Sequence, residues 1–135
     1  MLPLMLALAL QAAAPIAVQT LATDSMSQIE EPQQAVARTP AEWAQLWRKH
    51  AGDKTPPKVD FGSQMVVAVF LGSRSSAGYA VEILGMQQAG GVLTIEWRER
   101  RPDPGDVVAQ VMTSPSHLAA IPKFAGEVRF KKVTP

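Results

Sequence analysis

The sequence predicts an α+β fold, with a mostly antiparallel β-sheet of about five to seven strands, arranged as a sandwich or half-barrel and covered by one amphipathic helix. Residues 65–71 form a nearly continuous apolar run, which is typical of a central strand covered on both faces. One segment, between Thr39 and Gly52, has helical spacing, and short extended segments joined by turns follow it. One helix beside several short strands favours an α+β class with an antiparallel sheet.

The helix is expected to begin at a capping box. Thr39 precedes Pro40, and Glu42 stands three residues after Thr39. The Thr39 hydroxyl and the Glu42 carboxylate are therefore expected to bind each other's backbone N–H groups, and Gly52 is placed to end the helix. Four side chains share one helical face, namely Trp43, Leu46, Trp47 and His50. We expect both tryptophans in the core. We interpret His50 as a residue in the last turn whose positive charge the helix dipole stabilises.

The segments outside the helix are predicted to be mostly extended. Residues 79–84 follow the apolar run after a turn of small residues, and we expect the two to form a β-hairpin. Residues 101–106 contain prolines and a glycine and are expected to form a loop. Further strands are predicted at 16–21, 35–37, 93–97, 107–112 and 127–131. Trp97 lies on an alternating apolar face and is expected in the core.

The composition indicates a single globular domain. A chain of 135 residues can bury a core of its own without a metal ion or a disulfide. The formal net charge of +1 gives no electrostatic basis for binding nucleic acid. The basic stretch 98–101 is interrupted by Glu99, and we interpret it as a solvated strand end. No cysteine is present, so the core must supply the stability that a disulfide framework would give.

The first 14 residues resemble a secretory signal. They carry no charged side chain, residues 2–10 are apolar, and residues 12–14 are alanines suited to signal peptidase. The run is shorter than the roughly 20 apolar residues that a membrane span needs. We therefore predict a signal peptide at 1–14 and a single mature domain at 15–135. This domain is expected to be exported, periplasmic or secreted, without a transmembrane segment.

Catalytic chemistry is poorly represented in the sequence. His50 and His117 are the only histidines, and His117, after Pro115 and Ser116, is expected in a loop or turn. Neighbouring residues of an extended chain point to opposite faces, so Ser116 and His117 are poorly placed to share a proton. The acidic loop 103–106 is interpreted as a turn rather than a calcium site. We predict no catalytic residue, no metal and no cofactor, and an exported hydrolase remains the least favoured alternative.

Two segments are candidates for binding a partner. Small residues between the two expected hairpin strands would let the backbone approach another molecule closely, leaving an arginine and a tyrosine available for contact. The candidate residues of this segment are Gly72, Arg74, Ser75, Ser76, Ala77, Gly78 and Tyr79. The second segment contributes Thr113, Ser114, Pro115 and His117.

Both segments also carry a resemblance to a known family. Residues 59–61 read VDF, 65–72 read MVVAVFLG, 76–83 read SAGYAVEI, and 113–118 read TSPSHL, followed by IPK at 121–123. In order and spacing, this pattern resembles the PrcB family of protease-complex subunits over about residues 39–132. Ala77 replaces a glycine of that family's loop, and Ser116 stands where an aromatic residue is usual.

The resemblance implies a non-enzymatic, exported interaction subunit that assembles with or stabilises an extracytoplasmic protease complex. Its contact surface would be residues 72–79 together with residues 113–117. An alternative comes from inhibitors, because Gly78-Tyr79 is similar to part of the Thr-Thr-Gly-Tyr loop with which chagasin-type inhibitors enter the cleft of a cysteine protease.

Overall fold

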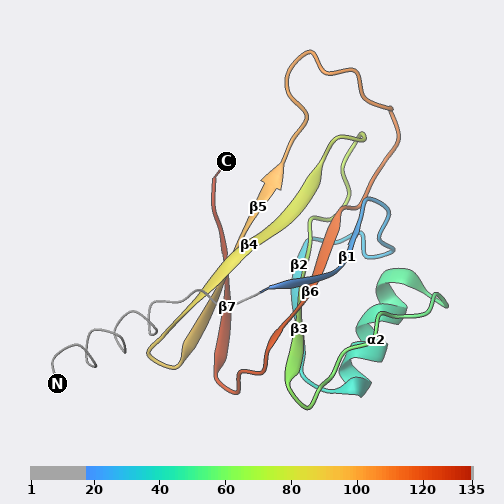
Figure 1. Cartoon of the computed structure of the whole chain (residues 1–135). Coiled ribbons are helices and arrows are strands. Elements are labelled where there is room, and N and C mark those ends of the chain that lie inside the picture. The colour runs from blue at the N-terminus through green and yellow to red at the C-terminus, as the bar shows by residue number, and fades with distance from the viewer. Residues whose placement is uncertain (1–17, 135) are drawn as a thin grey trace, which may run out of the picture.

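A computed structural model describes residues 18–134, and this part of the chain forms seven strands and one helix (Figure 1). The elements are β1 (Gln19–Asp24), β2 (Gln33–Ala37), α2 (Pro40–Ala51), β3 (Gln64–Phe70), β4 (Ala80–Ala89), β5 (Val92–Arg100), β6 (Ser116–Pro122) and β7 (Glu127–Lys132). The predicted α+β class is confirmed. The predicted signal peptide lies outside the described residues. Within residues 18–134, no helix has the length and apolar character needed to cross a membrane.

The strands form two sheets. The first has the order β1-β6-β3-β2 and is antiparallel throughout. The second has the order β4-β5-β7, in which β4 and β5 are antiparallel while β5 and β7 are parallel. The predicted hairpin between 65–71 and 79–84 is wrong. Because β2 and β6 occupy both edges of β3, residues 72–79 instead cross to the second sheet, where β4 pairs with β5.

The apolar run of β3 lies at the centre of a three-layer arrangement (Figure 1). One face of β3 packs against β4 and β5, with Val67 and Val69 in the same buried cluster as Ile95. The other face packs beneath α2, with Val66 and Phe70 in a second buried cluster. A strand with both faces covered has no solvated side, so its sequence is apolar at every position rather than at alternate ones.

The helix begins and ends as predicted, with one shift in its cap. The Glu42 N–H donates to the Thr39 hydroxyl at 3.1 Å, but the Glu42 carboxylate accepts from the N–H of Arg38 at 2.7 Å rather than from that of Thr39. Gly52 ends the helix with a positive φ of 64°. Trp43 and Trp47 are buried as predicted, and Trp97 is buried in the other cluster.

His50 differs from its prediction. Its side chain is buried beside Trp47 and Phe70, and its Nδ1 lies 2.7 Å from the hydroxyl of Ser27. Burial lowers the pKa of His50, because the imidazolium form loses its hydration. His50 is therefore a neutral core residue joined by a hydrogen bond, not a solvated cation at the helix end.

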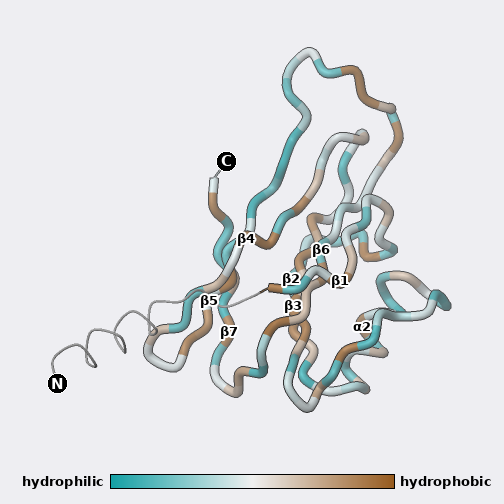
Figure 2. The backbone as a smooth tube through the Cα atoms, in the orientation of Figure 1, coloured by the Kyte–Doolittle hydropathy of each residue, from teal (hydrophilic) through white to brown (hydrophobic). Residues whose placement is uncertain are grey.

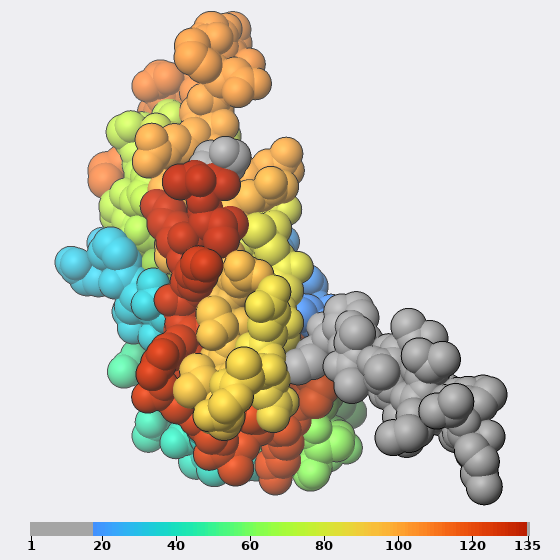
Figure 3. Space-filling model, turned by 90° about the vertical axis from the view of Figure 1, so that its left-hand side faces the viewer, coloured from blue at the N-terminus to red at the C-terminus, as the bar shows by residue number. Residues whose placement is uncertain are grey.

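The strand predicted at 107–112 is also wrong. Residues 101–115 form a long connection that contains only isolated bridges and projects beyond both sheets (Figures 1 and 3). A strand needs a ladder of hydrogen bonds to a partner strand, and here the backbone meets that of residues 72–79 only through the isolated Arg74–Thr113 bridge and a single bond at Ala77. The loop or turn predicted at His117 is wrong as well, because His117 lies in strand β6, which begins at Ser116.

Candidate functional site

The two segments predicted to contact a partner lie together at one end of the sandwich. We call residues 72–79 the crossover and residues 101–115 the long loop. Arg74 and Thr113 exchange two backbone hydrogen bonds of 2.7 and 3.0 Å. The N–H of Ala77 donates to the carbonyl of Ala109 at 3.0 Å, and the Thr113 hydroxyl donates to the carbonyl of Ser76 at 2.9 Å. The crossover is thus a platform on which the long loop rests.

Two glycines make this close approach possible. Gly78 has a φ of 97°, and a Cβ atom built there would lie 2.9 Å from Pro102 and 3.1 Å from Val108. Gly72 has a φ of 81°, and its Cβ would lie 2.7 Å from Pro32. The predicted permissive turn is confirmed, since both positions combine positive φ with tight packing. Gly78 therefore supports the long loop.

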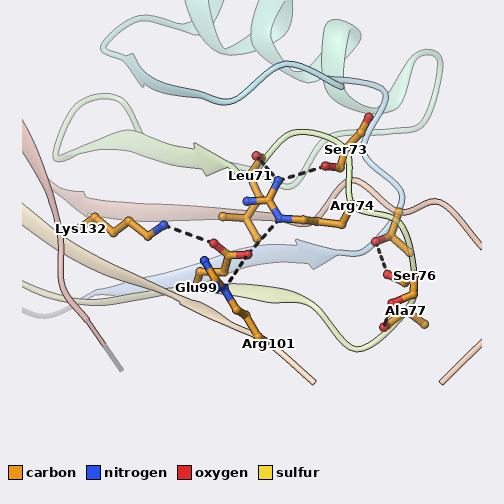
Figure 4. Close-up of polar contacts among 9 residues, drawn as sticks. Leu71, Ser73, Arg74, Ser76, Ala77, Glu99, Arg101 and Lys132 are labelled. Atoms are coloured by element: carbon orange, nitrogen blue, oxygen red, sulfur yellow. Dashed lines mark hydrogen bonds and ion pairs between the residues drawn. The ribbon is translucent and has the colours of Figure 1, made fainter. Parts of the chain in front are cut away.

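A buried carboxylate fastens the crossover to β5 (Figure 4). The Glu99 side chain is 4% exposed, and its oxygens lie 2.9 Å from Arg74 Nε, 3.2 Å from Lys132 Nζ and 3.7 Å from Arg101 Nε. The hydrogen bond from Arg74 is the main cause that lowers the pKa of Glu99 below its usual value, against the opposing effect of burial. We call these four residues the Glu99 cluster.

Arg74 is consequently a structural residue rather than a free contact. Besides its bond to Glu99, its Nη1 donates to the carbonyls of Leu71 and Ser73, both at 3.0 Å (Figure 4). Its guanidinium carbon also lies 5.9 Å from the centre of the Tyr79 ring. Arg74 thus fixes the shape of the crossover instead of remaining available to a partner.

The burial of Glu99 was not predicted, because residues 98–101 were interpreted as a solvated strand end. The signal was present, because Glu99 continues the alternation of Leu93, Ile95 and Trp97 on the buried face of β5. A charge on an inward face requires a partner of opposite charge. Arg74 supplies that partner from 25 residues away, across the sandwich.

The remaining crossover residues differ in exposure. Ser75 and Gly78 are exposed, Ala77 and Tyr79 are half-buried, and the other two candidates, Gly72 and Ser76, are buried. Tyr79 also lines a cleft of about 210 Å³ at the start of β4. The crossover therefore offers a partner little more than Ser75, Gly78 and the accessible part of Tyr79.

The second predicted segment is buried, its candidate residues being Thr113, Ser114, Pro115 and His117. His117 links the two sheets: its Nδ1 accepts the N–H of Ile83 in β4 at 2.9 Å, and its Nε2 lies 3.0 Å from the Thr20 hydroxyl in β1. Because Nδ1 is an acceptor, the ring proton is on Nε2, which donates to Thr20. Burial lowers the pKa of His117, although the Glu82 carboxylate opposes this shift. In this fold, these four side chains do not offer a contact surface.

Four of the five large apolar residues exposed in the described part of the chain lie on or beside the long loop, and they were not predicted as contacts. Val107 is 100% exposed, Met112 67% and Val111 43%, all on the long loop. Met26, 59% exposed, joins them through a bridge between its backbone and that of Ser114. We call these residues, Met26, Val107, Val111 and Met112, the apolar strip. Figure 2 shows hydrophobic stretches along the projecting loop. The sequence signal, an apolar run at 107–112, was interpreted as a strand.

Among residues 18–134, no group of three or more His, Asp or Glu side chains is placed to hold a metal ion. The acidic loop 103–106 forms a turn, as predicted. The N–H of Asp103 donates to the Asp106 carboxylate at 2.9 Å, and the N–H of Asp106 donates to the Asp103 carbonyl at 3.0 Å. The Asp106 carboxylate thus binds the backbone of its own loop.

Comparison with known proteins gives one match. Residues 65–122 match the model of the family described as PrcB C-terminal. This segment runs from β3 through β6 and contains the crossover, the long loop and three of the four residues of the Glu99 cluster. No curated protein and no solved structure matches the chain. The resemblance to the PrcB family is therefore confirmed over residues 65–122, which match its C-terminal domain.

Proposed function

We propose that this PrcB-type domain is a non-enzymatic subunit that assembles with or stabilises an extracytoplasmic protease complex, and that it binds its partner through the apolar strip. The observation that carries the proposal is the position of large apolar side chains on a projecting loop, with Val107 fully exposed. Large apolar side chains exposed close together are characteristic of protein-binding sites. The family match supports association with a protease complex.

The energetics favour binding at this loop. Each square ångström of apolar surface that a partner covers contributes about 25 cal/mol, so Met112 and Val107 would gain more from burial than a polar loop. The loop is already held by hydrogen bonds to the crossover, and the Glu99 cluster holds the crossover to β5. A surface ordered before binding loses less conformational entropy on association.

The alternative of a protease inhibitor receives less support. In that account, Gly78 and Tyr79 would form the tip of an inserted loop. Instead, Pro102 and Val108 of the long loop lie close to Gly78 on the side where a Cβ would stand, and Tyr79 lies beside Arg74. The hydrolase alternative is also weakened, because both ring nitrogens of His117 are engaged in hydrogen bonds within the core.

Export is part of the proposal and is supported by the uncharged apolar start of the sequence and its alanines. Protein isolated from the native cell envelope should have an intact mass that lacks about the first 14 residues. A full-length mass in the cytosolic fraction would contradict export.

Affinity capture with a matched pair of variants tests the proposed surface. Tagged wild-type protein should recover a protease component in fixed ratio from its own envelope fraction, with protease activity retained. Met112→Ser should lose most of that component. Leu84→Ser changes an exposed apolar residue on β4, outside the strip, and should recover as much as wild type. Equal recovery with both variants would reject the strip as the binding surface, and loss of protease activity in the complex would favour an inhibitor.

A further inference from the structure

We propose that the cleft beside Tyr79 binds a basic side chain of the partner polypeptide. The inference rests on the proposed function, because it concerns the same partner. The cleft has a volume of about 210 Å³ and is lined by Thr23, Asp24, Ser25, Tyr79, Ala80, Val81 and Ser116. We call it the Tyr79 cleft.

The cleft lies between the free edges of the two sheets. Its lining comes from the end of β1 and the start of β4, and each of these strands has a neighbour on one side only. The N–H of Ile83 points to His117 rather than to β5. Alternate residues of an antiparallel strand direct their backbone groups to the same side, so Val81 also directs its N–H and C=O toward this edge. The cleft therefore offers backbone as well as side-chain hydrogen-bonding groups.

The lining is rich in hydrogen-bond acceptors and has one formal charge. Asp24 is the charged residue among the lining side chains, and its Oδ1 accepts the N–H of Met26 at 2.7 Å. Ser116 also lines the cleft, and within the described part of the chain its hydroxyl is the one buried side-chain group without a hydrogen-bond partner. Arg74, whose guanidinium lies 5.9 Å from the centre of the Tyr79 ring, is already paired with Glu99. A carboxylate, hydroxyls and an aromatic ring suit a guanidinium or an ammonium group.

The size of the cleft limits its occupant. Sites for small-molecule ligands usually have volumes of about 300–1,000 Å³. The Tyr79 cleft is smaller, which suits the end of one side chain rather than a free metabolite.

The cleft also continues the proposed binding surface. Met26 of the apolar strip directly follows Ser25, and the N–H of Ser114 donates to the carbonyl of Ser25 at 2.7 Å. A partner whose apolar residues cover the strip can therefore place a basic residue of the same segment in the cleft. Burial of that cation beside Asp24 would add specificity to an otherwise apolar contact.

The test uses blocked amino acids as probes of the isolated protein. Titration of the ¹⁵N-labelled protein with acetyl-arginine amide or acetyl-lysine amide should shift the amide signals of residues 23–25 and 79–81 in a saturable manner. Acetyl-citrulline amide, the uncharged analogue of the arginine probe, should give no saturable shift. Preference for one of the two basic probes would identify the group that the cleft accepts.

Asp24→Asn keeps the oxygen that accepts from Met26 and should therefore fold, but it should weaken binding of the basic probe about tenfold or more. Asp53→Asn, an exposed aspartate after the helix, is the matched control and should bind as wild type does. Saturable shifts with the citrulline probe, equal binding by Asp24→Asn, or the absence of a saturable shift would each overturn the proposal.

The outcome is separable from that of the proposed function. Met112→Ser should bind the basic probe normally even though it loses the partner. If both Met112→Ser and Leu84→Ser recover the partner while the probe still binds at Asp24, the apolar-strip proposal fails and the cleft proposal stands. If Met112→Ser loses the partner, Leu84→Ser keeps it and the basic probe does not bind, the apolar-strip proposal stands and the cleft proposal fails.

Discussion

His117 makes the stability of the fold depend on pH. In the folded state, its Nδ1 must stay unprotonated to accept the N–H of Ile83, and burial lowers its pKa below the ordinary 6.5. The unfolded chain therefore binds a proton near pH 6.5 that the folded chain resists. Stability is fully present above that pH and declines as the pH falls below it. The lowered pKa of His50 acts in the same direction.

We expect the free energy of unfolding, measured by urea denaturation, to fall between pH 7.5 and pH 5. The slope cannot exceed about 1.4 kcal/mol per pH unit for each histidine. His117→Gln removes one titrating group and should make the decline shallower. Glu99 does not disturb this window, because its pKa is lowered from an ordinary value of 4.5. A slope that His117→Gln leaves unchanged would contradict the assigned role.

Arg74 offers a second test at the scale of single residues. Arg74→Ala leaves the buried Glu99 with only its two more exposed partners, Lys132 and Arg101, and should cost about 2 kcal/mol of stability. Arg100→Ala breaks an exposed pair with Glu82 and should cost less than about 1 kcal/mol. Denaturation of the two variants under the same conditions compares them directly, and equal costs would show that burial of Glu99 adds nothing.

The position of a single residue, buried or in a turn, was predictable where the local sequence pattern determines it. Trp43 and Trp47 follow from helical spacing, and Gly78 from its turn. Glu99 and His117 could not be placed in the same way. Their partners, Arg74 and Ile83, are 25 and 34 positions away, and only the arrangement of the two sheets brings each pair together.

At the scale of elements, α2 depends on its buried face. The Trp47 ring packs in the cluster beneath the helix, and its indole N–H donates to the carbonyl of Lys54 at 2.7 Å. Trp47→Ala should lower the free energy of unfolding by about 3–5 kcal/mol, because it leaves a cavity. Trp47→Phe keeps most of the packing and should cost less. Normal stability of Trp47→Ala in chemical denaturation would contradict a core role.

The crossover is expected to be sensitive at Gly78. Gly78→Ala combines a positive φ with a Cβ only 2.9 Å from Pro102, whereas Gly105→Ala has a similar φ of 93° and open space around its Cβ. Gly105→Ala should cost about 1 kcal/mol, the usual penalty of that backbone conformation. Gly78→Ala should cost clearly more, since the long loop must also move. Melting temperatures of the two variants measure the difference.

Predictions of helices and strands were correct where local pattern decides the element and wrong where the result depends on which strands pair. The apolar run of β3, the capped helix and the alternation in β5 are local signals, and each was correct. The supposed hairpin between β3 and β4 failed because strand adjacency in the sequence does not reveal which edges are already occupied. The apolar segment 107–112 failed for a related reason. It has strand composition but pairs with no strand, so Val107, Val111 and Met112 remain exposed.

The whole molecule combines a rigid sandwich with one projecting end. Two sheets enclose one core, α2 and the first sheet enclose another, and the crossover and long loop extend from the sheets (Figures 1 and 3). The Glu99 cluster and His117 join the parts of this end to the sheets. The candidate surface is thus carried by a stable scaffold, as binding loops commonly are.

Site-specific photo-crosslinking in the native cell tests the central claim most directly, because it reports what touches the loop in place. A photo-reactive amino acid replaces Met112 in one variant and Leu84 in another, both exposed apolar positions. We predict that the Met112 position crosslinks to one polypeptide of a protease complex and that the Leu84 position does not. Equal crosslinking of that polypeptide at both positions, or crosslinks at Leu84 alone, would contradict the claim that the long loop is the docking surface.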